Sequence, residues 1–208
     1  MARFTEAVCR LCRREGLKLY LKGPRCDSAK CAFNRRDYAP GKRSWRRGRP
    51  SDYALQLREK QKVKRYYGLG ERQFRHLFAR AERTRGNTGF ALLSMLERRL
   101  DNIIYLAGLA VSRPAARQMI THGCVLVNGR RAKTPSQVLR NDDVVTIAEA
   151  ENIQKLVGQA RELSKSRTEP SWIEVTAKPP TVKVISVPAR EDISVPAKEQ
   201  LIVELLSK

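Results

Sequence analysis

Long apolar segments are missing from this chain of 208 residues. No apolar run approaches the ~20 residues that a membrane-spanning helix needs, so we expect no transmembrane segment. The N-terminus also lacks the apolar core of a secretory signal peptide, so we expect a cytoplasmic protein. Because structural disulfides are rare in that reducing compartment, the five cysteines need another explanation.

Groups suited to catalysis are also scarce. The two histidines, His76 and His122, lie far apart in the sequence, and no glycine-rich phosphate-binding loop is present. The 21 acidic residues are scattered and mostly interleaved with lysine or arginine. An active site requires an acid, base or nucleophile held together with its partners, and the sequence offers no such set. We therefore expect that the protein is not an enzyme.

Basic residues dominate the charge. The chain has 42 Lys and Arg against 21 Asp and Glu, a net charge of +21, and +18 of it lies in residues 1–99. Such a surface favours a polyanion, because neutralising it releases condensed counterions. An anionic membrane would require an amphipathic helix with bulky apolar anchors outside the core, and none is evident. The charge indicates a nucleic acid, with no membrane partner and no small-molecule substrate.

Four of the five cysteines lie in the first 31 residues, as C-x2-C and C-x4-C pairs: Cys9, Cys12, Cys26 and Cys31. Two close pairs separated by a loop suit a tetrahedral four-thiolate zinc site, and four thiolates suit an iron–sulfur cluster equally well. A thioredoxin-like redox pair would require a neighbouring βαβ pattern, which is missing. The spacing predicts a structural metal site, zinc or alternatively a 4Fe-4S cluster.

The segment that follows is rich in arginine and in residues that break regular structure. Residues 38–53 read YAPGKRSWRRGRPSDY, and we predict a linker there. Extended arginine-rich segments suit irregular or single-stranded RNA, although a solvated linker is the simpler alternative. A tyrosine near its end could stack on a base or belong to the core. The candidate RNA contacts are Arg46, Arg47, Arg49 and Tyr53.

Two helices are predicted next, over residues 52–67 with Ser51 as N-cap, and over residues 71–85. Apolar residues of the second helix recur at i, i+3, i+4 and i+7 from Phe74, which predicts a core stripe. The basic and polar residues outside that stripe are candidates for RNA binding. They are Arg58, Lys60, Lys62, Lys64, Arg65, Arg72, Gln73 and Arg75.

The stretch from residue 97 is ERRLDNIIYLAGLAVSRPAARQMITHGCVLVNGRR. It predicts a short helix ending near Gly108, a second helix capped by Ser112, and a strand that enters an Asn-Gly hairpin turn. Arginines four apart share a helical face, and two more follow the turn. We expect both clusters to grip RNA phosphates, through Arg113, Arg117, Arg130 and Arg131.

The string SRPAARQMITHGCVLVNG resembles the small RNA-binding module named after ribosomal protein S-four. Further strings, RREGLKLYLKG, RPSDYALQLREKQKVKRYYGLGERQF, GNTG, LERRLDNIIYLAG and EQLIVELLSK, resemble the bacterial ribosomal protein S-four family over essentially the whole chain. The four cysteines resemble the metal-binding branch of that family. Where the family commonly has PGQHG after the metal segment, this chain has PGKRSW.

The resemblance implies an α+β fold with four parts. Residues 1–45 form the N-terminal four-cysteine metal segment, and residues 46–97 form a mainly helical domain that binds ribosomal RNA. The inserted small α/β module spans residues 98–164, and residues 165–208 return to the helical domain.

The resemblance also implies a function in the ribosome. Family members are structural constituents of the small ribosomal subunit that bind its ribosomal RNA early and nucleate assembly. They line the channel through which messenger RNA enters, contact neighbouring small-subunit ribosomal proteins and contribute to translational accuracy. RNA-modifying enzymes and tyrosyl-tRNA synthetases carry the same module, but they would also require a catalytic domain. A zinc-dependent transcription factor would leave most of the chain unexplained.

Overall fold

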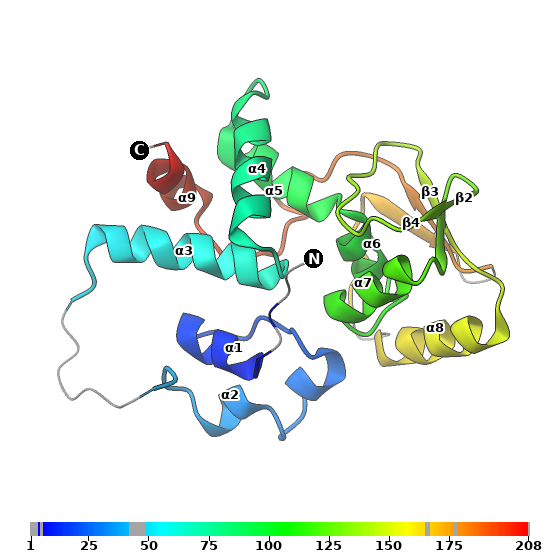
Figure 1. Cartoon of the computed structure of the whole chain (residues 1–208), viewed down its shortest axis with the longest axis horizontal. Coiled ribbons are helices and arrows are strands. Elements are labelled where there is room, and N and C mark those ends of the chain that lie inside the picture. Colours follow the sequence, from blue (N-terminus) through cyan, green and yellow to red (C-terminus); the bar gives the residue numbers. More distant parts are fainter. Residues whose placement is uncertain (1–3, 5, 42–48, 165–166, 177–178, 208) are drawn as a thin grey trace. The chain divides into compact units, whose positions relative to one another are not determined.

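The computed structural model describes residues 4, 6–41, 49–164, 167–176 and 179–207 (Figure 1). The chain divides into two compact units. The helical unit comprises Met1–Leu92 and Val195–Lys208, and the sheet unit comprises Leu93–Ser194. This arrangement confirms the α+β class, with a helical N-terminal part followed by a part that contains an antiparallel sheet.

The helical unit begins with short elements: α1 (Cys9–Glu15), the 3-10 helix η1 (Gly23–Cys26) and α2 (Ala32–Arg35). Longer helices follow, α3 (Asp52–Tyr66) and α4 (Glu71–Glu82), and α5 (Thr88–Glu97) continues into the sheet unit. Helix α9 (Glu199–Leu206) packs against α3, where Gln56 Nε2 donates to Glu204 Oε2 at 2.9 Å.

Local sequence signals explain how α3 and α4 form. The Oγ of Ser51 accepts the backbone N–H of Ala54 at 3.3 Å, so the predicted N-cap of α3 is confirmed. The predicted stripe of α4 is confirmed as well, because Phe74, Leu77, Phe78 and Ala81 are all buried. Since this stripe occupies one side of α4, the opposite side is left to its basic residues.

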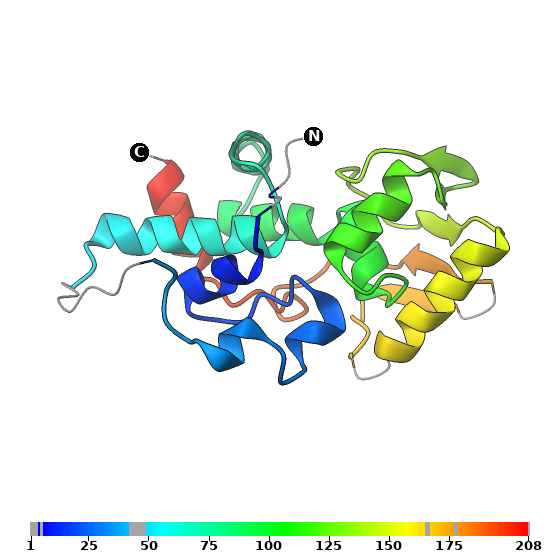
Figure 2. The ribbon, with the colours of Figure 1, turned by 60° about the horizontal axis from the view of Figure 1, so that its bottom comes forward.

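The sheet unit contains three helices and five strands, all within the described part of the chain. The helices are α6 (Leu100–Leu106), α7 (Arg113–Thr121) and α8 (Glu151–Ser164). The strands are β1 (Val125–Val127), β2 (Arg130–Ala132), β3 (Val144–Ile147), β4 (Ile173–Thr176) and β5 (Thr181–Val184). They form one antiparallel sheet in the order β2-β1-β3-β5-β4, and α6, α7 and α8 share its apolar core (Figure 2).

The predicted hairpin is confirmed. Strand β1 pairs with β2 in the register Val127↔Arg130, so Asn128 and Gly129 make the two-residue turn. Both turn residues have positive φ, 49° and 76°, as a primed hairpin turn requires. Asparagine tolerates this conformation and glycine adopts it without steric cost, which explains why this dipeptide fixes the register.

The sheet extends further along the chain than the sequence suggested. Residues 165–208 were expected to return to the helical domain, but β4 and β5 lie in the sheet unit and only Val195–Lys208 belongs to the helical unit. The physical reason is burial and pairing. Strand β3 pairs with β1 along one edge, and β5 pairs with its other edge. Trp172, Val182 and Val184 are buried in the core that this sheet shares with the helices.

Candidate nucleic-acid interface and cysteine cluster

Helix α4 presents a basic face to solvent. Arg72, Arg75, His76 and Arg80 are exposed on the side opposite the buried stripe, and Arg83 follows at the end of the helix. Arg75 lies 3.4 Å from Glu71, and the other three arginines have no ion-pair partner among the described residues. We call Arg72, Arg75, Arg80 and Arg83 the α4 face. Unpaired guanidinium groups on one helix side are suited to binding successive phosphates.

The three α4 residues that the sequence names as candidates for RNA binding differ in exposure. Arg72 and Arg75 belong to the α4 face, whereas Gln73 is half-buried and has contacts of its own. Sequence analysis did not include Arg80 and Arg83 among the site residues. Their signal was present, because positions 72, 76, 80 and 83 repeat at helical spacing on the side away from Phe74.

The lysines of α3 are engaged in ion pairs within the protein. Lys60 and Lys64 bind Glu71 at 2.6 and 2.8 Å, and Lys62 binds Glu59 at 2.6 Å. Burial alone would raise the pKa of Glu71, but hydrogen bonds from Lys60 and Lys64 lower it to about 2. The three α3 lysines that the sequence names as candidates for RNA binding are therefore bonded within the protein, and Lys60 is buried.

Two arginines of α3 point toward the cysteine-containing segment. Arg65 and Arg58 both pair with Glu15 at the end of α1, Arg58 at 3.4 Å, and the Glu15 side chain is 1% exposed. Burial raises the pKa of Glu15, and the charges of Arg65 and Arg58 oppose that shift. Burial likewise lowers the pKa of Arg65, which Glu15 counteracts. These pairs hold α1 against α3 instead of facing a ligand.

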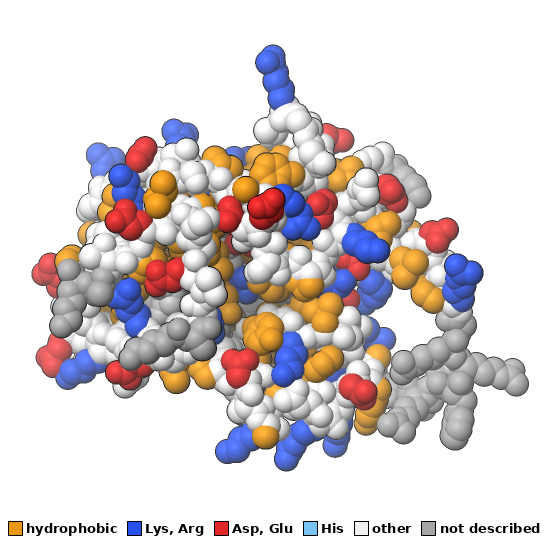
Figure 3. All heavy atoms as spheres, turned by 180° about the vertical axis from the view of Figure 1, so that it is seen from behind, with side chains coloured by type: hydrophobic (Ala, Val, Ile, Leu, Met, Phe, Trp, Pro, Cys, Tyr) orange, Lys and Arg blue, Asp and Glu red, His pale blue; other side chains and the backbone are white. Residues whose placement is uncertain are grey.

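Basic and acidic side chains alternate on one face of the protein. On the face shown in Figure 3, Lys and Arg are interspersed with Asp and Glu and form no continuous basic area. Near the start of α3, Arg49 is exposed and Tyr53 is 64% exposed, so the stacking role of Tyr53 fits better than a place in the core. Arg46 and Arg47 lie outside the described residues.

Arg113, which the sequence predicts to bind RNA, is buried within the sheet unit. Arg113 is 4% exposed, and its Nε donates to Asn102 Oδ1 at 2.8 Å. Its guanidinium group lies 4.4 Å from the centroid of the Tyr105 ring. Asn102 in turn donates to the Glu97 carboxylate at 2.5 Å. Arg113 therefore joins α7 to α6 within a buried polar network.

Arg117 is also engaged inside the module. Its Nε donates to Asp101 Oδ2 at 2.7 Å, and its side chain is 25% exposed. Arg99 makes two bonds to the same carboxylate, at 3.1 and 3.0 Å. Sequence analysis missed this cluster, although its acidic member lies in the LERRLDN string. The carboxylate of Asp101 orients both arginines.

The hairpin arginines remain available. Arg130 and Arg131 are exposed on β2, where neighbouring side chains point to opposite faces of the sheet. Lys133 and Arg140, which were not predicted as site residues, are exposed in the segment that follows. The exposed cations of the module are therefore those of the hairpin and the segment after it, whereas Arg113 and Arg117 are bonded within the fold.

The four N-terminal cysteines lie close together. Cys12, Cys26 and Cys31 are buried and Cys9 is half-buried, all as free thiols. Burial raises the pKa of the Cys12 and Cys26 thiols, and the charges of neighbouring thiols raise it further. The backbone N–H of Lys22 donates to Cys26 Sγ at 3.4 Å. Among the described residues, no three or more His, Cys, Asp or Glu side chains stand in the arrangement of a bound metal.

Within the ranges that the structure describes, we find no helix with the length and apolar character needed to span a membrane.

Known protein families match both parts of the chain. Residues 3–97 match the ribosomal protein S4/S9 N-terminal domain, and residues 98–145 match the S4 domain. The chain is 50% identical to the small ribosomal subunit protein uS4 of Pelotomaculum thermopropionicum, 51% to that of Solidesulfovibrio magneticus and 50% to that of Clostridioides difficile. Each alignment spans 208 residues and covers 100% of both chains. Similarity to ribosomal proteins over the full length confirms that the chain is not an enzyme, and the chain belongs to the family of the small ribosomal subunit protein uS4.

Proposed function

We propose that the chain is a structural constituent of the small ribosomal subunit and binds its ribosomal RNA. The observation that carries this proposal is the α4 face, a row of exposed arginines of which only Arg75 has an acidic partner among the described residues, in a chain that matches uS4 relatives from end to end. The exposed hairpin cations of the module supply a second contact area. By binding phosphates at two places, the protein holds a folded RNA junction in one arrangement.

The roles implied by the family resemblance follow from such clamping. A protein that fixes a junction early favours later assembly steps, so we propose that it nucleates assembly of the subunit. Contacts with neighbouring small-subunit proteins, with messenger RNA at the channel through which it enters, and a contribution to translational accuracy belong to the same proposal. Its place of action is the ribosome.

The test is binding of the full chain to small-subunit ribosomal RNA at several salt concentrations. Each phosphate contact contributes up to ~0.9 to the slope of log affinity against log salt. The double variant Arg72→Ala/Arg80→Ala should weaken binding and reduce the slope by somewhat under ~2.

The control is Lys155→Ala, which removes an exposed cation that pairs with Glu151 on α8. It should leave the affinity and the salt slope unchanged. An unaltered slope in the double variant would show that the α4 face does not contact RNA.

We further propose that Cys9, Cys12, Cys26 and Cys31 bind a structural zinc ion, with a 4Fe-4S cluster as the alternative. The chemistry of the donors supports this, because burial, together with the charges of nearby cysteines, raises the pKa of the Cys12 and Cys26 thiols, so a bound cation is needed to stabilise their thiolate forms. A backbone N–H donor to Cys26 Sγ fits a thiolate ligand. Among the described residues, the cysteine side chains are not arranged as the ligands of a metal ion. Ion binding would therefore have to draw the four sulfur atoms together. Metal analysis and the visible spectrum of anaerobically purified protein distinguish zinc from iron.

A further inference from the structure

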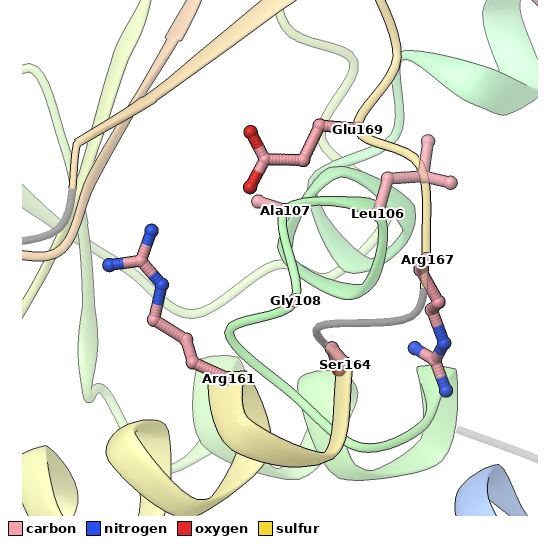
Figure 4. A pocket seen from close by; sticks show the side chains of 7 residues that line it. All are labelled: Leu106, Ala107, Gly108, Arg161, Ser164, Arg167 and Glu169. Carbon is pink, nitrogen blue, oxygen red and sulfur yellow. The ribbon is translucent and has the colours of Figure 1, made fainter.

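A cavity of about 400 Å³ opens in the sheet unit, where the ends of α6 and α8 meet Arg167 and Glu169 (Figure 4). Its volume lies in the ~300–1,000 Å³ range of small-ligand sites. Leu106 and Ala107 supply an apolar wall. Gly108 closes the turn after α6 with φ +69°, and a Cβ there would lie 3.1 Å from Ser164 Cβ. The glycine therefore keeps the cavity open beside α8.

Two polar atoms in the cavity wall lack hydrogen-bond partners among the described residues. Ser164 is 8% exposed and its Oγ is buried, and Nη1 of Arg167 is buried as well. Buried polar atoms are nearly always paired, so unpaired ones that line a cavity point to a ligand. The Arg167 guanidinium is preorganised, because it packs 4.6 Å from the Tyr105 ring centroid.

The cavity carries both signs of charge. Figure 4 shows Arg161 and Glu169 reaching toward the same side of the turn at Gly108, with Arg167 on the other side. Arg161 donates to the Thr176 carbonyl at 3.4 Å, and neither Arg161 nor Glu169 has an ion-pair partner within the described ranges. A phosphate would be repelled by Glu169, and a cation would be repelled by the two arginines. The complementary ligand presents acceptors and donors side by side.

We propose that this cavity takes one unpaired guanine of an RNA strand. Guanine has two adjacent donors, N1–H and N2–H₂, that match a carboxylate, and two adjacent acceptors, O6 and N7, that match a guanidinium. Adenine and the pyrimidines lack this paired arrangement. Unpaired bases are splayed out of RNA loops and read along these edges. Glu169 and Arg161 read the two edges of the base, and the buried Oγ of Ser164 and Nη1 of Arg167, on the other side of the turn, are left for the sugar and phosphate of the same strand.

This inference rests on the proposed RNA binding and names the base that the sheet unit selects. The probes are single-stranded oligouridylates that carry one central guanine, adenine or inosine, bound to the full chain in a fluorescence anisotropy titration at fixed salt. Guanine should be preferred over adenine by about fivefold or more, the discrimination expected of one bidentate base contact. Inosine, which lacks the exocyclic amine, should lie between them.

The variant Glu169→Gln should abolish most of the guanine preference while leaving the affinity for the adenine oligomer unchanged or slightly higher. The control Glu191→Gln makes the same charge change at an exposed residue outside the cavity and should retain the preference. The inference is wrong if wild-type protein binds small-subunit ribosomal RNA but shows no guanine preference, or if the preference survives Glu169→Gln. Absence of RNA binding altogether would refute the proposed function as well.

Discussion

The buried carboxylate of Asp101 should be one of the most sensitive positions of the sheet unit. It is 2% exposed and binds Arg99, which is itself 3% exposed, as well as the Nε of Arg117. The variant Asp101→Asn keeps the shape but removes the charge, so Arg99 is left buried without an anion. Breaking a buried ion pair in this way costs about 3–5 kcal/mol. We expect a loss of that size in the free energy of unfolding.

Urea denaturation followed by tryptophan fluorescence measures this loss. Trp172 is 1% exposed in the core of the sheet unit, and a Trp45→Phe background makes it the sole tryptophan of the two in the chain. The control is Asp142→Asn, the same change at a carboxylate that is 79% exposed and 3.3 Å from Lys183. An exposed pair contributes about 0–1 kcal/mol, and asparagine tolerates the positive φ of 65° at this position. Similar losses in both variants would refute the argument from burial.

Acid titration should reveal the cluster around Glu71. Because the folded pKa of Glu71 is lowered to about 2, its contribution to stability is present above the unfolded pKa near 4.5 and is lost as the pH falls toward 2. Urea denaturation between these pH values should show a shallower decline in Glu71→Gln than in wild type, and equal declines would contradict the pairing with Lys60 and Lys64. In the cysteine cluster, Cys26→Ser should abolish metal binding and expose residues 1–45 to limited proteolysis while residues 50–208 stay protected. A segment that resists proteolysis after chelation would contradict the metal proposal.

Short-range features of the fold were predictable from the sequence. The N-cap Ser51, the apolar stripe of α4 and the Asn128-Gly129 turn each depend on residues within one or two turns of chain, and all three were predicted. The membership of β4 and β5 in the sheet was not predicted. Their short apolar runs carry no information about which strand they pair with, and β3, the partner of β5, is separated from it in the chain by helix α8 and strand β4.

The candidate site was predictable to a lesser degree. Sequence identifies a basic residue but not whether a carboxylate neutralises it, because that depends on contacts made by the fold. Lys60 and Lys64 meet Glu71 only after the turn between α3 and α4, and Arg65 meets Glu15 across 50 positions. Arg72 and Arg80 lie on the solvent side of an amphipathic helix, so periodicity alone places them correctly.

This distinction changes how the net charge of +21 should be understood. A cation already bonded to a carboxylate of the protein must lose that bond before it can neutralise a phosphate, so it contributes less to RNA affinity than an unpaired cation does. The paired lysines and arginines of α3 instead stabilise the junctions with α1 and α4. The ion pairs of Lys60 and Lys64 with Glu71 secure the first turn of α4 to α3. Helix α4 is thereby held in place, and it presents its exposed arginines on a rigid support. Electrostatic preorganisation of this kind favours RNA binding because the protein loses less conformational entropy when the complex forms.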